Sequence, residues 1–159
     1  MGFAEHLERF WPDSAHEDIA SARAAVAERL PGFSVRRIAP EHPGKPWVYA
    51  TCGAAQAAAE GEEGAEYVLL APVADPVLVE MLAALATVNA DAPRGLGVGS
   101  LVALGRPWTD ASQADHLFVL PPYPFGPGFE ACEADGRRVV VLWLVPITAA
   151  EAQYVRARG

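Results

Sequence analysis

The sequence predicts an α+β (mixed α/β) fold, in which one mixed, largely antiparallel sheet of about six strands packs with N-terminal, central and C-terminal helices. Two patterns predict it: helical signals, either apolar spacing or a capping box, occur in the N-terminal, central and C-terminal segments, and short apolar runs bounded by turn residues lie between them. The chain has 159 residues, 52% of them hydrophobic and 20% charged, which suits one domain with a complete core. We expect a single domain over residues 1–159, with a helical N-terminal segment at 1–32 and a core at 33–159.

The first thirty residues have the apolar spacing of helices. The stretch FAEHLERFW, residues 3–11, places its large apolar side chains on one stripe. Ser14 and Glu17 have the spacing of a capping box, which predicts that a second helix begins there and continues to Leu30. The Pro-Gly pair at 31–32 would end that helix.

Two strands are expected next, one at 33–39 and one at 46–53. In the first strand apolar and polar residues alternate, so one of its faces should be solvated. The basic pairs Arg36-Arg37 and Arg137-Arg138 are interpreted as solvated edges. Residues 54–65 are rich in Ala, Glu and Gly without an apolar period, and are expected to form a mobile surface loop with one helical turn at most.

The middle of the chain predicts a buried strand followed by a buried helix. The apolar run at 66–72 suits a strand that is covered on both faces. Asp75 is a good N-cap and Pro76 a good first helical residue, so the helix should begin there. Its apolar stripe is expected to contain Leu78, Met81, Leu82, Leu85 and Val88.

The C-terminal half is rich in strand patterns. Strands are expected at 99–105 and 116–122. Asp135-Gly136 is the strongest hairpin signal of the chain, because this dipeptide readily takes the positive φ angles of a type I′ turn. The following run, 139–145, is apolar at every position and should be central in the sheet. A capping box at 148–151 predicts a final helix.

The stretch PRGLGVGSLVALGRPW, residues 93–108, raises the question of a phosphate-binding loop, because three of its glycines are spaced as GxGxG. A dinucleotide-binding loop leaves a strand and enters a helix, whose N-terminus binds the pyrophosphate. Here a helix precedes the glycines and a strand follows them. We therefore interpret them as a helix-to-strand connection, in which Gly95 or Gly97 is left-handed and Gly99 lets the backbone pack closely. No cofactor is expected.

Charge and composition disfavour several classes of partner. The net charge of −8 repels phosphate backbones, so no nucleic-acid partner is expected. No stretch is long and apolar enough to span a bilayer, and the N-terminus lacks the apolar run of a signal peptide, so we expect no membrane partner and a cytoplasmic protein. Neither Cys52 nor Cys132 has metal-ligand spacing to another cysteine or a histidine, and both are interpreted as small apolar residues.

No arrangement of residues predicts an enzyme. A cysteine-dependent hydrolase using Cys52 and His116 is kept as a remote alternative, since nucleophilic catalysis needs a thiol next to a base. The paired carboxylates of the chain fall in loops or at strand ends, where they are solvated. The expected function is therefore non-catalytic.

Aromatic residues in proline-stiffened loops are the strongest candidates for a binding surface, because such anchors bury much area at low entropy cost. Alternatively, these aromatic side chains fold back and cover the ends of the sheet. Exposed acidic residues would add an electrostatic field that steers a basic partner. The candidate partner-binding residues are Trp108, Asp110, Tyr123, Phe125, Glu60, Glu62 and Glu63.

Several segments, taken in order, resemble the suppressor of fused domain family. The family has an aromatic-containing strand that ends in Thr-x-Gly, a Glu-led apolar strand that ends in Pro, and a Gly-containing segment before a Pro-aromatic loop. An apolar strand that runs into Pro-Pro follows, and then a last strand that closes in P-[IL]-x-x-x-E. These motifs fall on Thr51 and Gly53, Glu66 to Pro72, Gly99 to Trp108, Leu117 to Pro122, and Pro146 to Glu151.

The resemblance implies a mixed α/β domain that binds proteins. Animal relatives clamp a peptide of Gli transcription factors, partly as an added β-strand, and bacterial relatives are thought to act in part as immunity proteins that neutralise toxins by direct binding. The leading hypothesis is thus an immunity or antitoxin-type protein whose partner is a basic toxin domain. The alternative is a regulatory scaffold that binds a peptide by strand addition.

Overall fold

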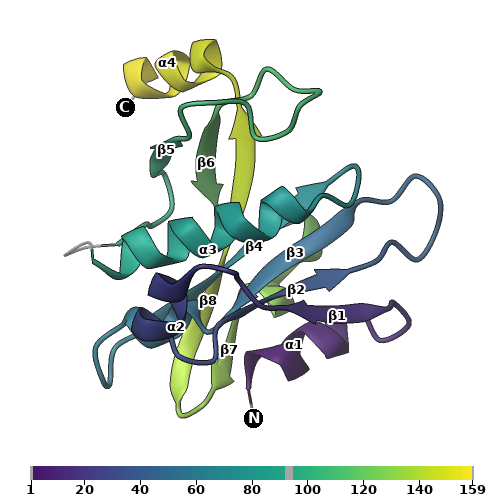
Figure 1. Cartoon of the computed structure of the whole chain (residues 1–159), viewed down its shortest axis with the longest axis vertical. Helices are drawn as coiled ribbons and strands as arrows, with labels where there is room; N and C mark the ends of the chain where they lie inside the picture. Colours follow the sequence, from purple (N-terminus) through teal and green to yellow (C-terminus); the bar gives the residue numbers. More distant parts are fainter. Residues whose placement is uncertain (1, 92–94, 159) are drawn as a thin grey trace.

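A computed structural model describes residues 2–91 and 95–158, and it has the predicted α+β fold, with eight strands rather than about six in one mixed sheet (Figure 1). The strand order is β1-β2-β3-β4-β8-β6-β5, with β7 also paired to β8. Only the β4–β8 pairing is parallel among the pairs of this sheet that the structure describes. The strands are β1 (His16–Ile19), β2 (Ser34–Ile38), β3 (Trp47–Cys52), β4 (Gly64–Ala71), β5 (Leu101–Ala103), β6 (His116–Leu120), β7 (Ala131–Ala134) and β8 (Arg137–Ile147).

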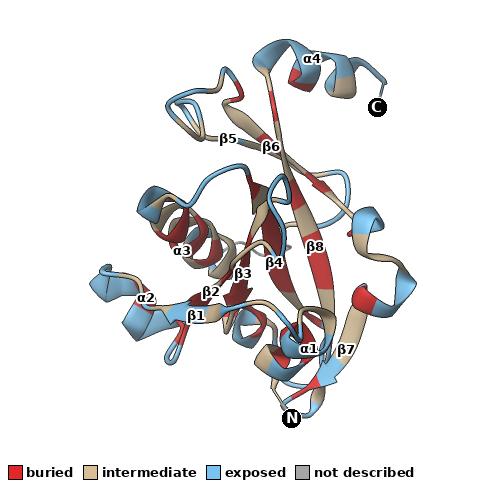
Figure 2. Cartoon of the chain, turned by 90° about the vertical axis from the view of Figure 1, so that its right-hand side faces the viewer, coloured by how far each residue is buried: buried red, intermediate tan, exposed pale blue. Residues whose placement is uncertain are grey.

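Helices cover both faces of the sheet. The helices are α1 (Phe3–Phe10), α2 (Ala24–Arg29), α3 (Pro76–Ala90) and α4 (Ala149–Arg158). One core cluster joins Leu78 and Leu82 of α3 to Tyr49 and Leu69 of the sheet. A second cluster joins α1 to side chains that point to the opposite face. Burial is concentrated in β3, β4 and β8, whereas α2 and α4 are largely exposed (Figure 2). No helix of the described ranges is long and apolar enough to cross a membrane.

The hairpin predicted at Asp135-Gly136 is confirmed. Asp135 has φ 52° and Gly136 has φ 80°, and both angles suit a type I′ turn between β7 and β8. The outgoing strand β8 pairs with β4, β6 and β7, so its central position is also confirmed. Thr148 and Glu151 form the expected reciprocal capping bonds at the start of α4.

The helix predicted from Ser14 to Leu30 is wrong in its first half. Residues His16–Ile19 form β1, which pairs antiparallel with β2, and only Ala24–Arg29 is helical. Ser14 donates its hydroxyl to Glu41, and Glu17 forms an ion pair with Arg37 of β2. The two residues of the expected capping box are thus used in contacts with distant parts of the chain, because pairing with β2 outweighs the local helical signal.

The prediction that one face of β2 is solvated is also wrong, because Arg36 is only 8% exposed. Its guanidinium donates two bonds to Asp18 of β1, at 2.9 and 3.0 Å, and one to Glu8 of α1 at 2.9 Å. Burying a guanidinium is tolerated only when its donors are satisfied, and here two carboxylates satisfy them. Arg36 therefore ties α1 and β1 to the sheet.

The glycine-rich stretch connects α3 to β5, as predicted; its first two residues, Pro93 and Arg94, lie outside the described residues. Gly95 is left-handed, with φ 65°, as one of the two expected alternatives. Gly99 is left-handed too, with φ 92°, and a Cβ there would meet nothing within 4 Å. Its role is therefore conformational, and the prediction of close backbone packing at Gly99 is wrong.

Candidate functional site

Three of the residues that carry the family resemblance form one buried polar cluster. Glu66 of β4 is 2% exposed and accepts four hydrogen bonds. Thr51 donates to Oε1 at 2.7 Å, and the backbone N–H groups of Gly53, Ala54 and Ala55 donate at 3.0, 3.0 and 3.2 Å. The carboxyl group thereby holds a short 3₁₀ turn, Ala54–Ala57, against the end of β3. All of its lone pairs are used by the protein itself, so the cluster is structural.

Burial dominates the titration of two groups at this cluster. It raises the pKa of Glu66 to about 7, although the four hydrogen bonds oppose the shift. Burial, assisted by the nearby Glu66 charge, raises the pKa of Cys52 to about 12. A thiol with such a pKa is almost entirely protonated at neutral pH and is a poor nucleophile.

The remote hydrolase alternative finds no support in the geometry. Cys52 lies on β3 and His116 on β6, and β4 and β8 lie between these two strands. Three strand spacings separate them by at least roughly 14 Å across the sheet, well beyond the reach of a base and its nucleophile. His116 instead places Nδ1 2.7 Å from Oδ1 of the neighbouring Asp115.

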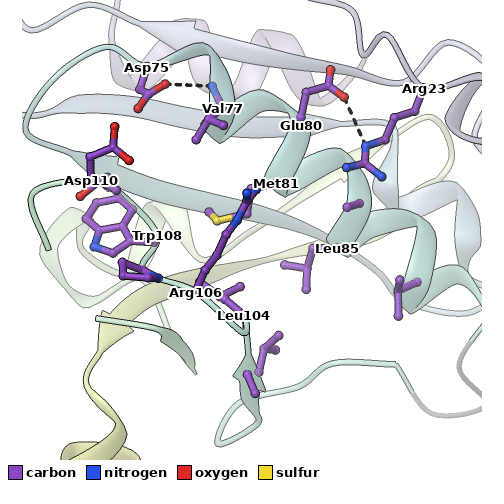
Figure 3. Close-up of a pocket in the computed structure, with 16 residues that line it drawn as sticks. Arg23, Asp75, Val77, Glu80, Met81, Leu85, Leu104, Arg106, Trp108 and Asp110 are labelled. Carbon is purple, nitrogen blue, oxygen red and sulfur yellow. Dashed lines mark hydrogen bonds and ion pairs between the residues drawn. The ribbon is translucent and has the colours of Figure 1, made fainter. Parts of the chain in front are cut away.

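A groove of about 540 Å³ lies between α3 and the segment that follows β5 (Figure 3). Met81 and Leu85 of α3 form one wall, and Leu104 and Trp108 form the other. The volume is within the range of sites that hold a ligand or a few peptide side chains. Two of the predicted residues, Trp108 and Asp110, line this groove.

Helix α3 is apolar on two faces, and only one of them packs against the sheet. The fully buried side is formed by Leu78, Val79, Leu82, Ala83 and Ala86. The predicted stripe is therefore only partly right, since Met81 and Leu85 are half-buried and Val88 is 70% exposed. The second apolar face is left for the groove. Sequence reasoning missed its role, because an all-apolar helix does not indicate which side is covered.

The loop that carries Trp108 is braced from within. Trp108 donates its indole N–H to Ser112 Oγ at 3.1 Å and its backbone N–H to Ala114 O at 2.9 Å. Ser112 Oγ also accepts from the backbone N–H of Ala114, at 3.0 Å. The half-buried Trp108 side chain packs on the core that α3 shares with the sheet. The groove wall is thus ordered in advance, which lowers the entropy cost of binding.

The groove adjoins an open edge of the sheet, because β5 is the last strand on its side. Leu104 donates its N–H to Asp115 O at 2.8 Å, and bonded pairs alternate along an antiparallel ladder. Val102 is therefore the next residue bonded to β6. The N–H and C=O groups of Leu101 and Ala103 point away from β6, and no other partner for them occurs within 2–91 or 95–158.

The other predicted binding residues lie elsewhere. Tyr123 is 67% exposed, whereas Phe125 packs against Trp11 and Phe129 with ring centroids 5.3 and 5.0 Å apart. Phe125 thus belongs to an aromatic cluster with Trp11 and Phe129, which packs with side chains of α1. The three glutamates lie exposed between the 3₁₀ turn and β4, away from the groove: Glu60, Glu62 and Glu63. The last of them pairs with Arg138 at 3.1 Å.

The chain is thus a mixed α/β domain with a groove beside an open sheet edge. Comparisons with known proteins identify its family. The family model of Suppressor of fused protein (SUFU) matches residues 27–159, and the chain belongs to this family. A crystal structure of a SUFU homolog from Neisseria gonorrhoeae is 31% identical, with a TM-score of 0.84 over 96% of this chain and 79% of that one. The resemblance stated from the sequence is thereby confirmed.

More distant structures share the fold alone. The Sufu–Fu complex matches at 14% identity with a TM-score of 0.71, covering 98% of this chain and 78% of the other. Drosophila Suppressor of Fused matches at 13% identity with a TM-score of 0.67, covering 96% of this chain and 42% of that one. No curated protein matched the sequence.

Proposed function

We propose that this SUFU-family chain is a non-catalytic protein-binding domain that accepts an extended segment of its partner along β5. The observation that carries the proposal is the unpaired edge at Leu101 and Ala103, directly beside an apolar groove. Backbone bonds to a free edge supply affinity, and pockets for alternate side chains supply specificity. The Sufu–Fu complex shows that a distant relative with this fold binds a protein.

For the partner itself, we propose a basic toxin domain that this chain neutralises as an immunity protein. The support is electrostatic: the chain has 20 acidic and 12 basic residues, and Glu60 and Glu62 are exposed. Such a surface accelerates the approach of a cationic protein. A regulatory scaffold that binds a host peptide by the same strand addition is the alternative.

A variant pair at Ala103 tests the binding mode. Proline at 103 removes the N–H that points to the open edge while leaving the bonds to β6 in place, and valine keeps that N–H. We expect affinity capture from the source organism, followed by mass spectrometry, to recover a partner with the wild type and with Ala103→Val, and at least tenfold less of it with Ala103→Pro. Equal recovery by all three folded proteins would contradict strand addition at β5.

The nature of the partner decides between the immunity protein and the scaffold. A captured toxin whose activity falls on stoichiometric addition of this chain would support the first, and a captured regulatory protein with no such activity would support the second.

A further inference from the structure

We propose that the segment bound in this groove is a peptide strand in which an apolar side chain is followed or preceded, two positions away, by a lysine or arginine. The inference rests on the proposed function and names the chemistry of the partner. The apolar side chain would lie between α3 and Leu104, and the basic one at the end formed by Asp75, Trp108 and Asp110.

The floor of the groove, meaning the part between Met81, Leu85 and Leu104, is apolar. Met81 and Leu85 line it on the α3 wall, and Leu104 faces them from the opposite wall (Figure 3). These side chains are half-buried, so an apolar group that settles between them removes their remaining surface from water. One aliphatic side chain of the partner is the occupant that this part of the groove fits.

The carboxylates around the groove differ in how many hydrogen bonds and ion pairs they form with the rest of the protein. Glu80 is held by Arg23 at 3.4 Å, by the Ser21 hydroxyl at 3.0 Å and by the Ala22 N–H at 3.0 Å. Asp75 accepts one bond, from the Val77 N–H at 3.0 Å, which uses Oδ1.

Asp110 is exposed, and no ion pair or hydrogen bond to it occurs among residues 2–91 and 95–158. Asp75 and Asp110 therefore keep carboxylate oxygens available at the groove.

These two carboxylates lie at the same end of the groove, next to the Trp108 ring (Figure 3). The ring is fixed by its bond to Ser112, and an aromatic face attracts a cation while carboxylates accept its N–H donors. A lysine or arginine side chain satisfies all three groups at once. An acidic side chain would be repelled by both carboxylates.

Arg106 sets the position of the basic residue. It also lines the groove, and in the view of Figure 3 its side chain extends toward α3 between the acidic end and Leu85. A cation placed there would be repelled, so the basic residue of the partner has to lie toward Asp110. Because side chains on one face of a strand are two positions apart, the basic and apolar residues should be separated by one residue.

The test is selection from a randomised peptide library displayed on phage, with the wild-type protein as bait. Selected peptides are then measured, as synthetic peptides, against four variants: Ala103→Pro, Ala103→Val, the double variant Asp75→Asn with Asp110→Asn, and the control variant Asp13→Asn with Glu133→Gln. Asparagine at 75 remains a good N-cap, so α3 is kept. Asp13 and Glu133 are exposed carboxylates outside the groove, so their variant controls for the loss of two negative charges.

We expect the selected peptides to share a basic residue two positions from an apolar one. Their affinity should fall about three- to tenfold in the double variant, as expected for two partly exposed ion pairs, and stay unchanged in the control variant. Arg106→Gln should strengthen binding about twofold or more.

Two other results have different meanings. Peptides that need the β5 edge but lack a basic residue, or that bind the double variant equally well, would overturn this inference and leave the proposed function standing. Failure to select peptides, or selected peptides that bind Ala103→Pro as well as Ala103→Val, would overturn the proposed function and this inference with it.

Discussion

At the scale of single residues, Glu66 determines how β3 ends. Its carboxyl group accepts hydrogen bonds from Thr51 and from three successive backbone N–H groups. It therefore supplies the acceptors that the N–H groups of this turn would otherwise lack. Gly64 lets β4 approach this turn, because a Cβ there would lie 2.7 Å from Ala55 Cβ. The Thr-x-Gly and Glu-led motifs are thus two halves of one structural device.

Replacing Glu66 with glutamine should destabilise the protein at pH 7. The side-chain NH₂ group would face N–H donors that need an acceptor, and each buried donor left unsatisfied costs about 1–3 kcal/mol. We expect a loss of about 2–4 kcal/mol in the free energy of unfolding, measured by urea denaturation. Glu62→Gln, at an exposed site, is the matched control and should change stability by less than about 0.5 kcal/mol. A wild-type midpoint for Glu66→Gln would contradict the structural role.

The stability contributed by Glu66 should also depend on pH. Its pKa is raised from 4.5 to about 7 by burial, so the folded state binds this proton more tightly than the unfolded state does. The contribution is complete below pH 4.5 and declines as the pH rises to about 7. The stability advantage of the wild type over Glu66→Gln should therefore be larger at pH 5 than at pH 8. An advantage that grows with pH over this range would contradict the assignment.

At the scale of elements, the two apolar faces of α3 have different roles. Leu82 is fully buried against the sheet, whereas Leu85, three residues further on, lines the groove. The first face holds the fold together and the second is available to a partner. The two leucines therefore form a matched pair of the same residue type in the same helix.

Alanine substitutions at these two positions should separate the contribution of α3 to stability from its contribution to binding. Leu82→Ala leaves a cavity in the core and should cost about 2–5 kcal/mol of unfolding free energy. Leu85→Ala should cost less than about 1.5 kcal/mol, because its side chain already contacts the open groove, yet it should weaken the binding of a groove peptide. Urea denaturation and peptide titration measure the two effects, and equal losses of stability would show that the groove face is part of the core.

Elements set by neighbouring residues were predictable from the sequence, whereas those set by distant partners were not. The Asp135-Gly136 turn and the cap of α4 depend on residues within three positions of one another, and both are confirmed. The helix from Ser14 failed because β2, some twenty residues away, offered a better partner for that stretch. In the site, Trp108 and Asp110 were identified by their loop, but Met81 and Leu85 were not.

At the scale of the whole molecule, the two ends of the strand order, β1 and β5, differ in character, and β7, which pairs with β8 alone among the described strands, has a free edge as well. The β1 strand carries Glu17 and Asp18, which are exposed and engaged with the two arginines of β2, and charges of this kind discourage further pairing. The β5 strand has no charged residue and lies beside the groove. Since β7 carries the exposed Glu133, β5 is the described edge that the proposed partner strand would join.

Amide hydrogen exchange, resolved by residue, tests the central claim most directly. In the free protein the N–H groups of Leu101 and Ala103 should exchange fast, while that of Val102, bonded to β6, is protected. Saturation with the captured partner or with a selected peptide should protect Leu101 and Ala103 strongly and leave β1 unchanged. Protection that appears only at β1 or over the Tyr123 loop, with Leu101 and Ala103 still exchanging fast, would contradict a binding edge at β5.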